Sequence, residues 1–367
     1  MKLQSPEGPF SEKLLYWYHQ NKRDLPWRNT KDPYPIWLSE IILQQTRVAQ
    51  GMPYFLRFMK AFPDIYKLYE ADENEILRHW QGLGYYSRGR NLLKCAKMIV
   101  EDYNGQFPRS YSSLLKLPGI GQYTASAIAS FAFEEAVPVV DGNVFRVLSR
   151  VFGIYNDIGD SKSMAIFKEV ARGLLPKNDV STFNQSLMEF GALQCVPAIP
   201  DCDICPFLMD CHARRNKKIP DLPVKGKKKK NEETFYNYMV FSKDHKIWMR
   251  KRTGKGIWNG LFDFYLLETK INQKIPPVLS NNPLKELILK YGKGFDSPPS
   301  YKHILTHKTI YASFYDIDLP KEENKIHQHL EGGKFYELSE IERLPKPILI
   351  DKFLKENLFV KFNPPYS

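Results

Sequence analysis

Residues 113–146 read SLLKLPGIGQYTASAIASFAFEEAVPVVDGNVFR, in which two apolar helical segments flank the turn at residues 117–121. Pro118 cannot continue a helix, because it lacks an N–H and clashes with the preceding turn. Gly119 and Gly121 lack a Cβ, so the backbone can adopt unusual angles and a ligand can approach closely. The helix after the turn presents free N–H groups that can hold an anion such as one DNA phosphate. The turn alone fits an ordinary αα-hairpin equally well, so other motifs must decide between a purely structural turn and one that binds a phosphate.

The composition indicates a two-domain protein with a polyanionic partner. The chain has 367 residues, a length at which two cores are expected. Its formal net charge of +12 favours binding to a polyanion such as nucleic acid. No run of 18 apolar residues is present, and the first residues lack the apolar core of a signal peptide. We therefore expect a cytosolic protein with no membrane contact.

The stretch PIWLSEIILQQT, residues 35–46, carries a candidate general acid. Its pattern predicts an almost wholly apolar helix that contains one acidic residue, Glu40. Helical spacing puts Glu40 on the same face as Trp37 and Leu43. Burial among apolar side chains disfavours the carboxylate and raises its pKa, which suits proton donation near neutral pH. The alternative is a glutamate at the solvent edge of an amphipathic helix.

A second candidate carboxylate, Asp141, lies in VVDGNV twenty residues after Gly121. We expect it beside the sugar of the DNA strand that the hairpin holds. Another motif, QGLGYYSRGR at residues 81–90, predicts a tight glycine turn that presents tyrosines. A rigid aromatic or apolar wedge can unstack a base and hold a bent duplex, and Arg88 and Arg90 can meet phosphates. The alternative for this motif is a glycine turn with core tyrosines.

Four of the five cysteines fall within 17 residues and predict a metal site. Their spacing is C-x6-C-x2-C-x5-C, formed by Cys195, Cys202, Cys205 and Cys211. Zinc usually takes two CxxC-type pairs, whereas this spacing contains one. Four cysteines are also the normal ligand set of an iron–sulfur cluster, so both readings stay open on spacing. Cys95 is expected to be a buried thiol.

The sequence pattern changes after the cysteines. Residues 214–233 are rich in lysine and arginine and indicate a flexible, exposed connector. Beyond them, strands are predicted at residues 235–241, 247–252, 262–267, 301–307 and 310–315, with helices near 282–291 and 347–356. Earlier, helices are predicted at residues 8–21, 64–100 and 163–194. The chain is therefore expected to join a helical domain to an α+β domain.

Taken together, these motifs resemble the helix-hairpin-helix DNA glycosylases, and within them the MutY-type adenine glycosylases. The resemblance covers nearly the whole chain, with its motifs in the family's order. It implies a mainly α glycosylase domain over residues 1–213 with a [4Fe–4S] loop at 195–211. It also implies the basic linker at 214–233 and a Nudix-like α+β domain at 234–367. The segment after Leu267 lacks the R-E-x-x-E-E run of a working Nudix hydrolase, so we expect no such activity.

The resemblance implies roles for individual residues. Glu40 would be the catalytic acid and Asp141 the group that stabilises the sugar cation, with Asn143 and Tyr123 beside them. The cluster ligands would be the four clustered cysteines. The substrate pocket and the DNA or 8-oxoguanine contacts would come from the residues that match the corresponding family motifs: Trp27, Arg28 and Gln185 for the pocket, and Gln44, Gln45, Thr46, Leu83, Tyr85, Gly119, Gly121, Thr306 and His307 for the DNA.

Two of these matches depart from the family pattern. Many MutY-like chains have an acid at the position of Gln185. The family's F-S-H loop, which reads 8-oxoguanine, is Leu305-Thr306-His307 here.

The implied activity is the removal of adenine mispaired with 8-oxoguanine or guanine in double-stranded DNA, by a monomer. Bifunctional relatives carry a lysine just before the Thr-Ala of the hairpin helix, whose amine forms a Schiff base. This chain has Tyr123 there, which predicts a monofunctional enzyme. Two alternatives are a pyrimidine-removing glycosylase/lyase of the endonuclease III type and a DNA-binding module without catalysis. The missing lysine and the extra domain argue against the first, and the two acids argue against the second.

Overall fold

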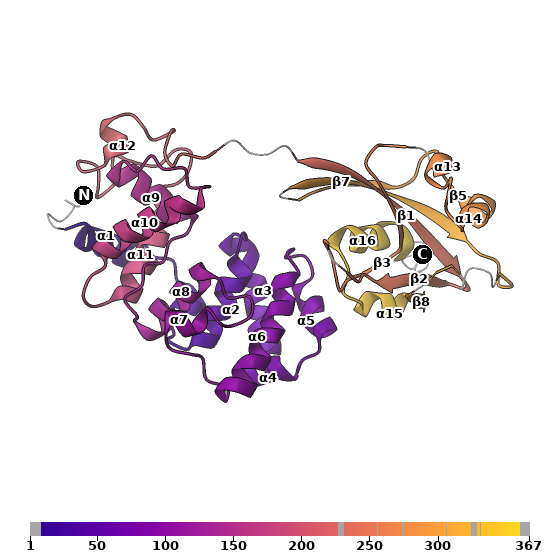
Figure 1. Cartoon of the computed structure of the whole chain (residues 1–367), viewed down its shortest axis with the longest axis horizontal. Helices are drawn as coiled ribbons and strands as arrows, with labels where there is room; N and C mark the ends of the chain where they lie inside the picture. Colours follow the sequence, from indigo (N-terminus) through magenta and orange to yellow (C-terminus); the bar gives the residue numbers. More distant parts are fainter. Residues whose placement is uncertain are drawn as a thin grey trace, which may run out of the picture. The chain divides into compact units, whose positions relative to one another are not determined.

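The computed structural model describes residues 9–226, 231–254, 256–273, 275–305, 307–323, 329–330 and 332–359. The chain divides into two compact units, Met1–Glu70 with Asn91–Lys227, and Ala71–Arg90 with Lys228–Ser367. The first unit is helical and the second contains the sheet (Figure 1). The helix bounds are α1 Phe10–Asn21, α2 Pro33–Leu43, α3 Val48–Ala61, α4 Ile65–Glu70, α5 Glu73–Trp80, α6 Ser87–Tyr103, α7 Tyr111–Leu114, α8 Gln122–Phe133, α9 Gly142–Phe152, α10 Ser161–Leu174, α11 Val180–Leu193 and α12 His212–Arg215, with a short 3-10 helix, η1, at Pro26–Arg28.

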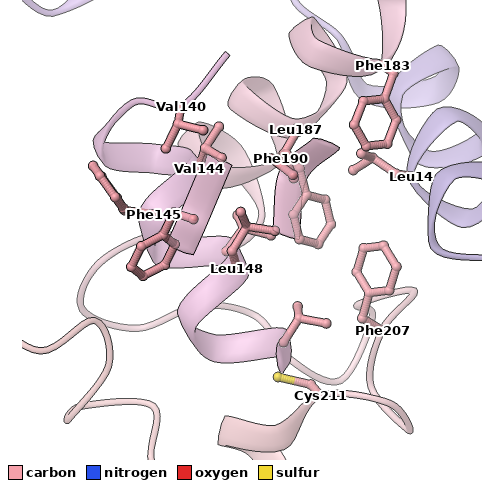
Figure 2. Close-up of a cluster of buried hydrophobic side chains, with 14 of the residues drawn as sticks. Leu14, Val140, Val144, Phe145, Leu148, Phe183, Leu187, Phe190, Phe207 and Cys211 are labelled. Carbon is pink, nitrogen blue, oxygen red and sulfur yellow. The ribbon is translucent and has the colours of Figure 1, made fainter. Parts of the chain in front are cut away.

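One core of the helical unit joins α1, α9 and α11 to the cysteine loop (Figure 2). Along α9, Val144, Val147, Leu148 and Val151 recur at helical spacing and are all buried. Phe207 of the cysteine loop packs edge-on against Phe190 of α11, with ring centroids 5.2 Å apart, and is stacked on Phe10 of α1 at 4.5 Å. Apolar burial therefore fixes the cysteine loop to the helix that begins at Asp141.

Helix α2 is buried on nearly all sides, from Tyr34 to Ile42. A helix that is apolar all round belongs in a core, as its sequence indicated. Ile36 packs with Ala127 and Phe131 of α8, so α2 and the hairpin helix share one cluster. This packing brings the acid of α2 to the first turn of α8.

The second unit contains a mixed sheet of eight described strands. The central strands β1 and β7 run parallel, and the other pairings are antiparallel. The element bounds are β1 Glu232–Lys243, β2 Lys246–Lys251, β3 Phe262–Asp263, β4 Tyr265–Thr269, α13 Ile275–Val278, α14 Lys285–Tyr291, β5 Gly292–Lys293, β6 Ser300–Ile304, β7 Lys308–Asp318, β8 Gly333–Tyr336, α15 Leu338–Arg343, α16 Ile348–Phe353 and a π-helical turn, η3, at Leu354–Leu358.

Both faces of this sheet are covered by helices. On one face, Met239 and Ile317 pack in a cluster with Ile288 of α14. On the other face, Phe314 is stacked between Tyr238 and Phe353 of α16, with centroid distances of 5.1 and 4.0 Å. The alternation of side chains along β1 and β7 places these two sets on opposite sides of the strands. The α+β architecture expected from the sequence is thus present.

Element boundaries differ from the sequence expectations where turns interrupt the pattern. The helical stretch predicted over 64–100 is three helices, α4, α5 and α6. The glycine turn predicted within it is confirmed, with positive φ angles at Gly82 and Gly84, whereas the break before α5, where Asp72 is the N-cap residue, was not predicted. The strand predicted at 262–267 is broken after Asp263, where β3 pairs with β2 and β4 pairs with β1. The strand predicted at 301–307 ends at Ile304.

Within the connector expected at residues 214–233, Leu222 departs from the expected exposure, whereas Pro220, Asp221, Lys225 and Gly226 are exposed. Leu222 is 1% exposed, and its carbonyl accepts a hydrogen bond of 2.9 Å from Nε of Arg150. Val224 accepts a backbone hydrogen bond from Ile158, and the Gly226 amide donates to Asp157. Apolar residues among the lysines therefore tie this segment to α9 and the loop after it. Residues 227–230 lie outside the described residues.

Candidate active site

The helical hairpin places exposed amides at the start of α8. Gly119 adopts φ +77°, and a Cβ at this position would lie 2.6 Å from Cβ of Asn91, so glycine is required there. Gly121 is extended and exposed, and no atom of the described chain lies within 4 Å of a Cβ placed on it. It is the N-cap residue of α8 and makes no side-chain cap. The first amides of this helix are therefore open to an approaching anion.

Glu40 lies on α2 and is 6% exposed. The hydroxyl of Tyr123, in the first turn of α8, donates a 2.7 Å hydrogen bond to its Oε2. Burial raises the pKa of Glu40 to about 7, while the Tyr123 hydrogen bond lowers it. Asp141 adds a smaller upward effect on this pKa and Arg28 a smaller downward one. The desolvation expected from the sequence is confirmed, and Glu40 can hold or release a proton near neutral pH.

Asp141 is the N-cap residue of α9. Its Oδ1 accepts from the backbone amides of Asn143 and Val144 at 2.9 and 2.8 Å, and its Oδ2 accepts from Nδ2 of Asn143 at 2.8 Å. Burial raises the pKa of Asp141, against the lowering effect of these hydrogen bonds. The carboxyl group is therefore fixed in orientation at a helix N-terminus, where negative charge is favoured.

These two acids line one cavity of about 170 Å³ within the helical unit. Its walls come from η1, α2, α8, α9 and α11. Among the residues predicted for the site, the cavity brings together eight: Trp27, Arg28, Glu40, Thr46, Tyr123, Asp141, Asn143 and Gln185. Gln185 accepts from the Tyr18 hydroxyl at 3.4 Å and donates to Oγ of Ser181 at 3.1 Å.

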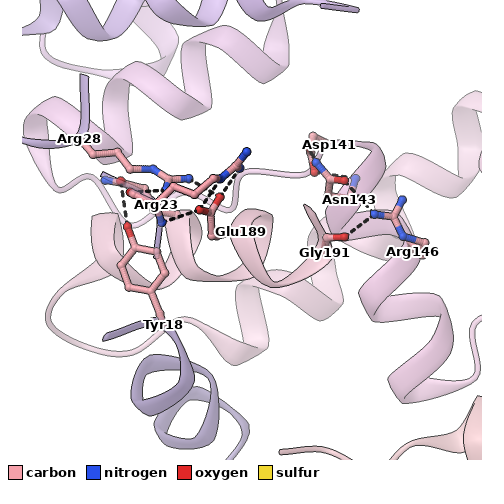
Figure 3. Close-up of polar contacts among 9 residues, drawn as sticks. Tyr18, Arg23, Arg28, Asp141, Asn143, Arg146, Glu189 and Gly191 are labelled. Carbon is pink, nitrogen blue, oxygen red and sulfur yellow. Dashed lines mark hydrogen bonds and ion pairs between the residues drawn. The ribbon is translucent and has the colours of Figure 1, made fainter. Parts of the chain in front are cut away.

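Glu189 also lines the cavity, and the sequence reasoning missed it. Figure 3 shows its carboxylate between Arg23 and Arg28, which donate to Oε2 at 2.6 and 2.7 Å. Burial opposes ionisation, but the hydrogen bonds from the two arginines lower the pKa of Glu189 to about 2. Its position four residues after Gln185, next to Met188 and Phe190, was the available signal, since it predicts an acid on the same buried helical face.

The other residues predicted to contact DNA lie after α2, in the second unit and in the turn after α5. Gln44 and Gln45 follow α2, where Gln45 has φ +56° and Nε2 of Gln44 donates to Oγ1 of Thr124. Thr46 donates its hydroxyl to the Gln44 carbonyl. In the second unit, His307 precedes β7 and is exposed, whereas Thr306 lies outside the described residues.

The turn after α5 presents one aromatic side chain. Tyr85 is 47% exposed and has φ +49°, whereas Leu83 and Tyr86 are buried. Tyr86 thus does not project from the turn as expected. Arg88, predicted to meet phosphate, is buried, and its guanidinium donates to the Leu83 and Gly84 carbonyls. Arg88 therefore holds the turn together, because a buried guanidinium must be satisfied by nearby acceptors.

The four clustered cysteines line one small cavity and form no disulfide. Nη1 of Arg150 lies 3.5 Å from Sγ of Cys195, and Sγ of Cys211 donates to the Arg150 carbonyl. Burial raises the pKa of Cys205 to about 12, so this thiol needs a neighbouring cation to become a thiolate. In the part of the chain that the structure describes, no three metal-ligating side chains converge closely enough for a single ion.

Helix α9 also connects Asp141 with the cysteine loop through Arg146. Its Nη2 donates to Oδ1 of Asn143 at 2.8 Å and to the Gly191 carbonyl at 2.5 Å, as Figure 3 shows. Its Nε donates to the Cys195 carbonyl at 2.7 Å. The Arg146 guanidinium therefore links two parts of the unit. It holds the Asn143 side-chain amide, which itself donates to Asp141, and it binds the backbone carbonyl of Cys195.

Among the helices that the structure describes, none combines the length and apolar character that a bilayer crossing requires.

Residues 38–172 match the family model described as HhH-GPD superfamily base excision DNA repair protein, and residues 237–356 match the NUDIX domain. The adenine DNA glycosylase of Buchnera aphidicola subsp. Schizaphis graminum is 35% identical over 92% of this chain and 96% of its own. The human adenine DNA glycosylase is 42% identical over 59% of this chain and 41% of its own.

Among solved structures, a thermostable thymine-DNA glycosylase is similar to the chain with a TM-score of 0.52 and 30% identity. It covers 56% of this chain and 95% of its own. The expected fold class is confirmed by the two family matches and by this likeness. The chain therefore belongs to the adenine DNA glycosylase family and is a DNA N-glycosylase of base excision repair.

Proposed function

We propose that the chain removes adenine mispaired with 8-oxoguanine or guanine, as a monofunctional enzyme that hydrolyses the N-glycosidic bond. The observation that carries this proposal is the placement of two carboxyl groups, the buried Glu40 and the half-buried Asp141, in the wall of one cavity. A general acid and a cation-stabilising carboxylate are what glycosidic cleavage requires. The open amides of the hairpin lie on α8, the same helix that holds Tyr123 against Glu40.

In the proposed reaction, adenine is flipped out of the duplex into this cavity. Tyr123 donates to Oε2 of Glu40, which leaves Oε1 to carry the proton. Glu40 transfers that proton to N7 of adenine, and the base leaves with the electron pair of the C1′–N9 bond. A pKa of about 7 keeps a substantial fraction of Glu40 protonated near neutral pH.

Asp141 stabilises the positive charge that develops on the sugar. Its orientation is set by the amides of Asn143 and Val144, so little reorganisation is needed when the cation forms. Asn143 is held by Arg146 and orients the carboxyl further. After adenine leaves, the Glu40 carboxylate takes a proton from water, whose oxygen bonds to C1′. The products are free adenine and an abasic site.

Trp27, Arg28 and Gln185 form the wall that receives the base. Trp27 is buried against Phe55 and supplies an apolar surface. Arg28 is a donor, and the amide of Gln185 offers both a donor and an acceptor, so together they can read the polar edge of a purine. The hydrogen bonds of Gln185 to Tyr18 and Ser181 fix its amide orientation.

The proposed duplex contacts are made outside the cavity. Gly119 and Gly121 let a phosphate approach the amides of α8. Tyr85, exposed on a glycine turn, is the proposed intercalating wedge, and Leu83, Gln44, Gln45 and Thr46 are assigned to the region of the orphaned 8-oxoguanine. Residues 234–367 are the proposed 8-oxoguanine-reading domain, with Thr306 and His307 in its reading loop, after a catalytic domain of residues 1–213 and a linker of 214–233.

We assign a [4Fe–4S] cluster to Cys195, Cys202, Cys205 and Cys211. The donor set fits, because four thiols line one cavity and a buried thiol needs a cation to ionise. A tetrahedral zinc ion would hold its sulfurs about 3.8 Å apart, given Zn–S bonds of about 2.3 Å. The four cysteines would each supply one thiolate to a [4Fe–4S] cluster and, unlike zinc ligands, would not have to meet at a single ion. When bound, the cluster would fix the loop and take no part in glycosidic cleavage.

The absence of strand cleavage is inferred from Tyr123. This residue occupies the position where bifunctional relatives carry an amine, and its hydroxyl is engaged by Glu40. A phenol cannot form a Schiff base with the sugar aldehyde. Borohydride treatment of the protein with adenine-mispaired or abasic duplexes should give no robust covalent adduct, and a strong adduct would contradict the monofunctional assignment.

The substrate is tested by free adenine released from duplexes that carry A:8-oxoguanine, A:G or A:T. We expect release from the first two and none above background from the third. Release from A:T at a comparable rate, or removal of a pyrimidine from a damaged pair, would refute the proposed substrate. Iron and sulfide analysis of the same preparation tests the cluster, and stoichiometric zinc in place of iron would refute it.

A further inference from the structure

The ion-pair cluster of Glu189, Arg23 and Arg28 has no role in the reaction described above beyond the contact of Arg28 with the base. Glu189 is buried on α11, and its side chain is 1% exposed. Its Oε1 accepts from Nε and the backbone amide of Arg23 at 2.8 and 3.0 Å. Its Oε2 accepts from Nη2 of both arginines. Both oxygens are therefore used, and the carboxylate cannot turn without breaking charge-assisted bonds.

This arrangement fixes the orientation of Arg28. Nη2 of Arg28 donates to Glu189 at 2.7 Å, and Nη1 donates to the Arg23 carbonyl at 3.3 Å. Among the described residues these are the hydrogen bonds that Arg28 donates, so its other N–H groups remain for a ligand in the cavity that it lines. Its guanidinium carbon also lies 5.9 Å from the ring centroid of Tyr18. The Arg28 guanidinium is thus held both by its hydrogen bonds to Glu189 and Arg23 and by its contact with the Tyr18 ring.

The cluster is linked to Glu40 through the charge of Arg28. The charged or titratable groups acting on Glu40 are Tyr123, Asp141 and Arg28. Those acting on Glu189 are Arg23 and Arg28, while Glu189 itself raises the pKa of Tyr18. Arg28 favours the carboxylate form of Glu40, which is the wrong form for a proton donor. The Glu189 carboxylate, 2.7 Å from the same guanidinium, carries a compensating negative charge.

We propose that Glu189 is a positioning residue for base excision: it orients Arg28 toward the flipped base and neutralises its charge so that Glu40 stays protonated. This inference rests on the proposed roles of Arg28 and Glu40. A purely structural function is the competing explanation, because the cluster also ties the segment after α1 to α11. The two explanations differ in the pH dependence of the chemical step, which a structural tie alone does not move.

The test is single-turnover adenine release from A:8-oxoguanine duplexes between pH 5 and 9, with the full-length protein. For Glu189→Gln we expect a loss of about 10- to 100-fold at pH 7, the range for a misplaced catalytic contact. We also expect the alkaline limb of the profile to move to lower pH, because an unneutralised Arg28 favours the Glu40 carboxylate. In an Arg28→Met background, Glu189→Gln should cause no further shift of that limb.

The matched control is Glu169→Gln, which removes an exposed ion pair with Arg172 outside the cavity and should leave rate and profile unchanged. Should Glu189→Gln not fold, Glu189→Asp keeps the charge but shortens the side chain, and it should lower the rate while leaving the limb in place. A wild-type rate and profile in Glu189→Gln, or a limb displaced equally in the Arg28→Met background, would overturn the inference. If wild-type protein released no adenine, the proposed function would fail instead.

Discussion

Replacing Glu40 by glutamine should stabilise the protein in a pH-dependent way. The pKa of Glu40 is about 7 in the folded chain, against 4.5 for an ordinary glutamate. Each pH unit of that difference corresponds to about 1.4 kcal/mol, so ionisation costs the folded state about 3 kcal/mol above pH 7. Below pH 4.5 the carboxyl is protonated in both states and the cost vanishes. Between pH 4.5 and pH 7 the carboxyl is ionised in the unfolded chain but still protonated in the folded chain. The free energy of unfolding of the wild type therefore falls as the pH rises, and the loss is complete once the pH has passed through 7.

Glutamine is uncharged at every pH and can still accept the Tyr123 hydrogen bond through its side-chain carbonyl. The difference in unfolding free energy between Glu40→Gln and wild type should therefore be near zero at pH 4.5 and reach about 3 kcal/mol in favour of the variant at pH 8. For a helical unit of this size that corresponds to a rise in Tm of roughly 6–12 °C. Thermal melting followed by tryptophan fluorescence at several pH values measures it.

Glu101→Gln, at an exposed position of α6, is the control for this series. Solvent hydrates that side chain in the folded and the unfolded chain alike, so its Tm difference from wild type should stay flat from pH 4.5 to 8. A flat difference for Glu40→Gln as well, or a variant less stable than wild type at pH 8, would refute the claim that burial is what raises the pKa of Glu40.

Three further substitutions test separate parts of the site. Tyr123→Phe removes the hydrogen bond that lowers the pKa of Glu40, so the alkaline limb of single-turnover adenine release should move to higher pH; a limb that moves down or stays in place would contradict this. Arg146→Met removes donors from the Asn143 amide and from three backbone carbonyls, so it should cost about 2–4 kcal/mol in denaturant unfolding and reduce adenine release; unchanged stability would contradict it. Gly119→Ala forces a Cβ toward Asn91 at positive φ, so it should cost about 1–3 kcal/mol in the same assay and weaken duplex binding measured by fluorescence anisotropy; wild-type values in both assays would show that the hairpin does not need glycine there.

Much of the fold followed from the sequence, because long apolar periodic segments leave few alternatives. The burial of α2 around Glu40 is one such case, since a helix of this composition has to be covered on every side. Boundaries were less predictable where turns depend on tertiary contacts. The predicted strand at residues 262–267 is an example, because it is divided into β3, which pairs with β2, and β4, which pairs with β1.

The polar connections of the site could not be read from one chain. The bond between Tyr123 and Glu40 joins residues 83 positions apart, and it exists because α2 packs against α8. Glu189 pairs with arginines more than 160 positions away. Arg88 fits a phosphate contact by type, yet burial turns it toward the carbonyls of its own turn. Residue type suggests a chemistry, whereas packing selects the partner.

The most direct test of the account is single-turnover adenine release from A:8-oxoguanine duplex by Glu40→Gln, measured beside the affinity of the same variant for that duplex. We expect base release to fall to the uncatalysed background while duplex binding remains close to that of wild type. Adenine release at the wild-type rate would contradict the assignment of Glu40 as the proton donor.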